Sequence, residues 1–156
     1  MGPFTMEASR PSSVGIDRTG KFGESVEEFL ESVPGAGDLF AWFGYWPNFH
    51  DAEIISLALN RSGASTLRIH TWETTSRVDE RGYYVLDKHV HVAFQMEDIR
   101  SLSLSDFNQQ NVIFGLSLRH TEDGFEICLD PCYGLSGSIL AQKLSIQIEP
   151  MPPGAS

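Results

Sequence analysis

Apolar and polar residues alternate with a period of two along most of the chain after Pro47. In 54–60, for example, Ile55, Leu57 and Leu59 fall on one side of an extended chain. Such segments, separated by short turns, are typical of antiparallel strands with one buried face. The pattern predicts an antiparallel meander sheet of about six to seven strands, with segments at 54–60, 66–74, 83–94, 99–104, 112–118, 125–129 and 140–148.

A helical pattern precedes the strands. Apolar residues recur at helical spacing over 25–33, and Ser25 with Glu28 has the form of a capping box. Asp38 can cap a second short helix over 39–43.

A sheet with one apolar face needs a cover, which these helices supply unless the sheet curls on itself. The sequence therefore predicts an α+β fold with one or two N-terminal helices packed on the sheet.

Length and terminal composition predict one domain. A chain of 156 residues is large enough to bury a core. We expect a flexible leader at 1–20, a single α+β domain at 21–149 and a flexible tail at 150–156. The N-terminus lacks the apolar stretch of a secretory signal, and no apolar run is long enough to cross a bilayer. These features favour a cytoplasmic location and no membrane contact.

The formal net charge of −10 argues against nucleic acid as a ligand, because phosphate binding needs clustered Lys and Arg. The charge is unevenly placed. Residues 22–60 contain seven carboxylates and no Lys or Arg. This distribution fits either a solvated acidic surface or the attraction of a basic partner.

The segment from Trp46 to Leu57 contains the pair His50-Asp51, which is one candidate for chemistry. A functional pair would use His50 as a base, with Asp51 or Glu53 setting its tautomer. Neighbours on a strand point to opposite faces, so the pair needs a turn. The structural interpretation, which we favour, has Asn48 or Asp51 bonding local amides while His50 packs beside aromatic residues.

Histidines on two predicted strands form a second candidate. His89 and His91 share one face of a strand, and His70 lies on a strand that can be its hairpin neighbour. Three imidazoles on one face can hold zinc with an open coordination position. Half-exposed strand faces also carry histidine for structural reasons, and a one-residue slip in register would separate the three.

Two further segments have structural and binding interpretations. The cluster Trp42, Phe43, Tyr45, Trp46 and Phe49 suits a core or lid, although exposed aromatic residues are also enriched at binding hot spots. The polar segment 106–111 lacks glycine-rich phosphate geometry, and we expect it to form a turn.

Two short motifs carry a resemblance to a known family. Phe49-His50-Asp51-Ala52-Glu53 leads into one strand and Phe107-Asn108-Gln109-Gln110-Asn111 leads into another. With them, residues 40–148 resemble the immunity protein 50 family of bacterial polymorphic toxin systems. The resemblance implies a cytoplasmic α+β protein that binds and neutralises a cognate toxin, and it implies no catalytic residue. The characteristic positions that it marks are Trp46, Phe49, His50, Asp51 and Glu53.

The sequence therefore predicts stoichiometric inhibition of a toxin, for which the acidity suits a basic nuclease. The expected contact residues are Asp38, Trp42, Tyr45, Trp46, Phe49, His50, Asp51 and Glu53. No cofactor is expected. An alternative is a small metal-dependent hydrolase or ligand-binding β domain that uses His70, His89 and His91. A monomer and a homodimer paired through strand edges both stay open.

Overall fold

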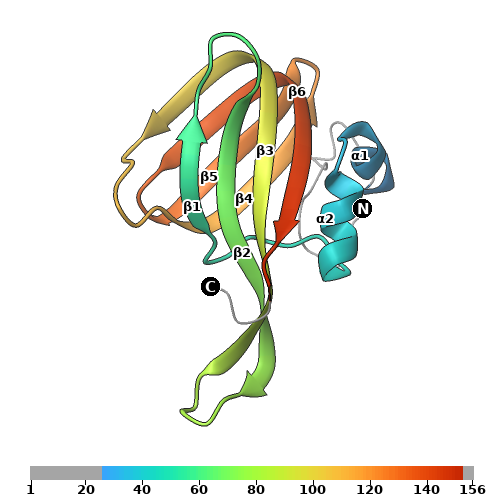
Figure 1. Ribbon diagram of the computed structural model, residues 1–156. Coiled ribbons are helices and arrows are strands. Elements are labelled where there is room, and N and C mark those ends of the chain that lie inside the picture. The colour runs from blue at the N-terminus through green and yellow to red at the C-terminus, as the bar shows by residue number, and fades with distance from the viewer. Residues whose placement is uncertain (1–25, 153–156) are drawn as a thin grey trace, which may run out of the picture.

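Two short helices and six strands make up residues 26–152, the part of the chain that the computed structural model describes. Figure 1 shows the strands curving around a common interior, with the helices at one side. The antiparallel sheet and the N-terminal helices agree with the predicted α+β class. The elements are α1 (Val26–Ser32), α2 (Ala36–Phe43), β1 (Glu53–Ala58), β2 (Ser65–Val78), β3 (Tyr84–Ser105), β4 (Val112–Thr121), β5 (Gly124–Tyr133) and β6 (Ser136–Pro150).

The strand order differs from the predicted meander. The strands form a closed barrel in the order β1-β2-β3-β6-β5-β4. Strand β6 pairs with β3 along its whole length, from Pro150 opposite Val90 to Ser136 opposite Ser105. The two segments predicted at 83–94 and 99–104 are therefore one strand, with a shift in register between Ile99 and Ser101. Closing the barrel leaves few unpaired strand edges.

Strands β1 and β4 meet at the narrowest join of the barrel, which we call the seam. Glu53 lies opposite Val112 there. The Ile113 amide donates to the Ala52 carbonyl at 2.8 Å, and the Ile54 amide donates to the Asn111 carbonyl at 3.0 Å. The seam is therefore held by a few backbone hydrogen bonds rather than a long ladder.

The inner faces of the strands and the aromatic residues before β1 form one core. The Phe49 ring packs edge-on against Phe94 of β3, and the Phe29 ring of α1 packs against Trp46 and Phe125. The apolar face of the sheet is therefore covered in both of the ways considered: the sheet curls on itself, and the helices pack against it. No helix within residues 26–152 is long and apolar enough to span a membrane.

The turn between α1 and α2 docks on β6. The Ile146 amide donates to the Pro34 carbonyl at 2.7 Å. Gly35 has φ 88°, and a Cβ there would lie 1.6 Å from the Ile146 carbonyl oxygen. Helix α1 matches the predicted helix at 25–33 within one residue at each end, and the predicted Ser25 cap lies outside the described residues.

Strands β2 and β3 extend beyond their neighbours as a two-stranded arm, visible at the bottom of Figure 1. The pairing of β2 with β1 stops at His70, and the pairing of β3 with β6 stops at Val90. Beyond these residues, β2 and β3 pair with each other up to Val78 opposite Tyr84. We call residues 72–89 the arm.

Candidate functional site

The chain turns sharply just before β1, at the pair His50-Asp51. Phe49 and Asp51 both have left-handed backbone conformations, with φ 62° and 68°. The Asn48 side-chain oxygen accepts a hydrogen bond from the His50 amide at 2.8 Å. As a result His50 Nε2 lies 3.6 Å from Asp51 Oδ1, and both side chains are exposed. The turn that the pair requires is present, and Asn48 makes the local amide bond that the structural interpretation expected.

The His50 ring is fixed on Phe114 of β4. Its Nδ1 lies 3.0 Å from the Phe114 carbonyl oxygen, so Nδ1 carries the proton and donates. The two rings pack edge to face with centroids 5.2 Å apart. His50 therefore packs beside an aromatic residue, as the structural interpretation expected, but that residue comes from β4 and not from segment 42–49.

The apolar alternation Val112, Phe114, Leu116 and Leu118 predicts that Phe114 faces the core, and the structure shows that this prediction is wrong. The register of β4 against β5 shifts between Ile113 and Gly115, so Phe114 is the extra residue of a β-bulge. Ile113 is buried and Phe114 is 56% exposed. A second bulge, between Ile54 and Ser56, turns Ile55 outward in β1. Ile54 is buried and Ile55 is exposed, although the alternation predicted that Ile55 faces the core.

Exposed acidic and aromatic side chains from the turn before β1 and from β1, β4 and β5 form a surface across the seam, which we call the seam patch. Glu53, Val112 and Tyr133 are cross-strand partners, so their side chains share the outer face of β1, β4 and β5. Asp51 and His50 join this face next to Phe114. The seam patch consists of His50, Asp51, Glu53, Phe114 and Tyr133.

The three histidines predicted to cluster do so on the outer face of β2 and β3. His70 lies directly opposite His91, and its Nε2 is 3.0 Å from His89 Nδ1. Its Nδ1 is 3.3 Å from Glu53 Oε1. His70 is only 7% exposed, because His89, His91 and Trp72 surround its ring.

The arrangement of the histidines does not suit a metal. Both ring nitrogens of His70 already have partners, and the atom that faces His89 lies at hydrogen-bond distance from it. Among residues 26–152, no group of three or more His, Cys, Asp or Glu side chains is arranged to hold a metal ion. The alternative interpretation of His70, His89 and His91 as zinc ligands is therefore not supported by their geometry.

Burial lowers the pKa of His89 and His91 below the usual value of histidine. The charge of His70 lowers both pKa values further, and Arg68 also lowers that of His91. Asp87 and Glu149 act in the opposite direction on His89 and His91 respectively. A positive charge on His89 or His91 is therefore disfavoured in the folded chain.

Two of the expected contact residues are core residues in the folded chain. Phe49 is 1% exposed and Trp46 is 8% exposed. Their rings contact each other and reach Phe94 and Phe29. Because they are buried in the folded chain, they offer a partner little or no surface, and the structure assigns them to the core rather than to a contact surface. The core interpretation of the aromatic cluster holds for these two and for Phe43.

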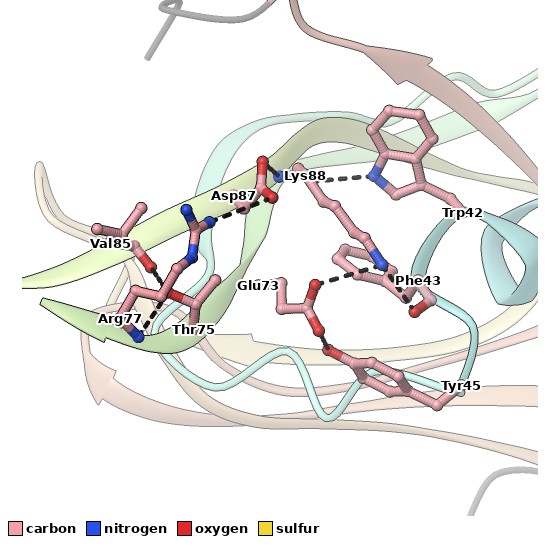
Figure 2. A network of polar contacts seen from close by, with 9 residues as sticks. All are labelled: Trp42, Phe43, Tyr45, Glu73, Thr75, Arg77, Val85, Asp87 and Lys88. Carbon is pink, nitrogen blue, oxygen red and sulfur yellow. Dashed lines mark hydrogen bonds and ion pairs between the residues drawn. The ribbon is translucent and has the colours of Figure 1, made fainter.

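Trp42 and Tyr45 lie at the base of the arm, as Figure 2 shows. The Trp42 indole donates to the Lys88 carbonyl at 2.9 Å. Lys88 Nζ lies 3.3 Å from Glu73 and donates to the Phe43 carbonyl at 3.2 Å. The Tyr45 hydroxyl donates to Glu73 at 3.2 Å. Burial, followed by the charge and hydrogen bond of Glu73, raises the pKa of Tyr45 to about 12.

The remaining expected residues have simpler surroundings. Asp38 is exposed within the first turn of α2 and does not cap the helix as expected, because α2 begins at Ala36, after Gly35, and has no side-chain cap. In the polar segment 106–111, Asn108 Oδ1 accepts hydrogen bonds from the amides of Gln110 and Asn111. Asn111 is buried, and its side-chain oxygen accepts from the Leu135 amide at 3.1 Å. This segment is the turn that the sequence predicted.

Comparison with protein-family models, curated proteins and solved structures gives no match for this chain.

Proposed function

We propose that this protein is an immunity-type inhibitor that binds a basic toxin domain through the seam patch. The single observation that carries the proposal is Phe114, an exposed phenylalanine whose ring packs against His50, and His50 in turn lies 3.6 Å from the exposed carboxylate of Asp51. An aromatic side chain with a fixed position is a typical anchor of a protein interface, because little conformational entropy is lost when it is covered.

The charges around Phe114 determine the kind of partner. Asp51 is exposed beside the His50 ring that packs on Phe114, Glu53 is exposed on β1 opposite Val112, and the whole chain has a net charge of −10. Carboxylates around an apolar centre attract a basic surface over long distances and pair with its Lys and Arg side chains on contact. A basic nuclease domain has such a surface where it binds phosphates, and the carboxylates would occupy the place of those phosphates.

The identification of the partner as a toxin rests on the resemblance of the segments 49–53 and 107–111 to the immunity protein 50 family. Only part of the first motif belongs to the seam patch. Phe49 packs in the core and fixes the turn, whereas His50, Asp51 and Glu53 face solvent. In this motif Phe49 fixes the backbone of the turn, and the other three residues provide exposed side chains for contact with a partner. This arrangement supports a protein that binds its partner and does not catalyse a reaction.

A growth assay tests the proposal. The protein encoded by the gene next to that of this chain is expressed in a bacterial host, alone and together with the wild type or a variant, and should be toxic when expressed alone. The wild type should restore growth, and the double variant Phe114→Ala, Asp51→Asn should restore it much less. Asparagine suits the left-handed backbone at position 51, so the change removes charge rather than structure.

Asp98→Asn is the matched control, because Asp98 is also exposed and left-handed (φ 59°) but lies on β3. This control should protect as well as the wild type. If a folded double variant protects as well as the wild type, the assignment of the seam patch as the contact surface is wrong. A neighbouring gene that encodes no toxin, or a wild type that fails to protect, would overturn the proposed function itself.

A further inference from the structure

The arm carries an exposed row of uncharged side chains along one face. Val78 lies opposite Tyr84 and Thr74 lies opposite Leu86, so these four side chains share a face. Trp72, two residues before Thr74, continues the row, and its ring contacts that of His89. We call this row the outer stripe: Trp72, Thr74, Val78, Tyr84, Leu86 and His89.

The opposite face of the arm is charged and is attached to the body of the protein. Glu73 and Asp87 lie opposite each other on that face. Lys88 has φ 54° at a shift in register, and this bulge brings its ammonium group to Glu73 and to the end of α2. Figure 2 shows how Trp42, Tyr45 and Lys88 anchor the base of the arm. The arm is therefore held in one orientation with its outer stripe turned away from these contacts.

An uncovered stripe of this kind is unusual for a two-stranded ribbon. Val78, Tyr84 and Leu86 are among the exposed large apolar side chains of the chain. A ribbon of two strands is only marginally stable in water unless one face is packed. The charged face is packed at its base, so the outer stripe is the face that a partner would cover.

The charge of the stripe indicates which partner. A basic protein would be drawn to the carboxylates of the seam patch rather than to a row that has none. Two copies of a chain with net charge −10 repel each other at long range, and this repulsion is smallest where the facing surfaces carry no carboxylates. The outer stripe is such a face, and a two-fold axis would place the same stripe of each copy against the other.

We propose that the outer stripe is a homodimer interface in which two arms pack face to face. This inference does not depend on the proposed function, because the stripe and the seam patch have no residue in common. In such a dimer Tyr84 and Leu86 of each copy would lie near the centre and lose their contact with water.

Sedimentation equilibrium of the full chain tests the proposal, over protein concentrations from about 1 to about 100 μM, the range of weak homodimers. We expect a reversible dimer. Tyr84→Ser should weaken it at least about tenfold, since interface aromatics often contribute more than 1.4 kcal/mol. Added salt should strengthen the dimer or leave it unchanged, because it screens the repulsion between the two acidic chains.

Tyr83→Ser is the matched control. Tyr83 is the adjacent residue, is 65% exposed against 64% for Tyr84, and lies beneath the Arg81 guanidinium outside the stripe. The Tyr83→Ser substitution should leave the dissociation constant of the dimer unchanged. Leu86→Ser provides a second test if Tyr84→Ser loses the circular dichroism of the folded chain. A monomer at every concentration, or a dimer that neither stripe variant weakens, would overturn the proposal.

Discussion

At the scale of single residues, left-handed backbone conformations determine which side chains reach the surface near the seam. Asp51 and Asn111 are residue types that tolerate this conformation, whereas Phe49 is a bulky residue that rarely adopts it. Burial of the Phe49 ring against Phe94 stabilises the turn despite that cost. The sequence showed that a functional His50-Asp51 pair needs a turn, but it could not show that both side chains would face solvent.

The histidine cluster shows what residue patterns predict well. The period of two placed His89 and His91 on one face, and hairpin pairing with β2 brought His70 opposite His91. The pattern could not indicate that His70 would be buried with both ring nitrogens occupied. That outcome depends on Glu53 and Trp72, whose positions follow from register and not from spacing.

We predict that the stability of the fold decreases as the pH falls below about 6.5, the ordinary pKa of histidine. The pKa values of His89 and His91 are lowered in the folded chain. The unfolded chain therefore binds more protons between 6.5 and these lower values, and acid favours unfolding in that window. Above pH 6.5 these two histidines should make no pH-dependent contribution.

Urea unfolding at a series of pH values measures this effect, and NMR titration of the ring protons assigns it. In His70→Gln, the pKa values of His89 and His91 should rise, because a neighbouring positive charge is removed while burial persists. Unchanged pKa values in this variant would show that His70 does not interact with them electrostatically.

At the scale of elements, apolar alternation located the strands but not their irregularities. The strands β2, β4, β5 and β6 lie where the alternation placed them. The bulges at Ile55 and Phe114 reverse the face of single residues, and the alternation of apolar residues does not mark them. Phe114 was therefore missed as a candidate site residue. Its position between Ile113 and Gly115 is the only local signal, since a glycine in a strand often accompanies a bulge.

The turn between α1 and α2 provides a prediction at this scale. Gly35→Ala should destabilise the fold by at least about 2 kcal/mol, because a Cβ would collide with the Ile146 carbonyl and the backbone is left-handed. Thermal unfolding measures the change. Gly37→Ala is the control: it lies in α2 with no atom within 4 Å of the added carbon, so it should stabilise the fold by about 0.5–1 kcal/mol. Equal effects of the two substitutions would contradict the docking of this turn on β6.

At the scale of the whole molecule, the partners of the strands were the least predictable feature. Alternation defines which face of a strand is buried, and it says nothing about which strand lies beside it. The pairing of β3 with β6 and the return of β4 to β1 join strands that are distant in sequence. This closure creates the seam, so the candidate site arises from the topology and not from any one motif.

The topology also divides the segment that the sequence treated as one contact surface. Trp46 and Phe49 enter the core, Trp42 and Tyr45 support the arm, and His50 with its neighbours lies at the seam. Composition alone could not separate these roles, because aromatic residues suit a core and an interface equally well. Exposure in the folded chain distinguishes them.

The rate at which this protein associates with the protein encoded by the neighbouring gene tests most directly whether the seam patch attracts and holds a basic partner. Stopped-flow measurements compare the wild type, Asp51→Asn with Glu53→Gln, and the control Asp98→Asn at about 0.05 M and about 0.3 M salt. We predict that the double variant associates more slowly at low salt and depends less on salt, whereas the control matches the wild type. Identical rates and identical salt dependence in all three proteins would contradict the attraction of a basic partner to the seam patch.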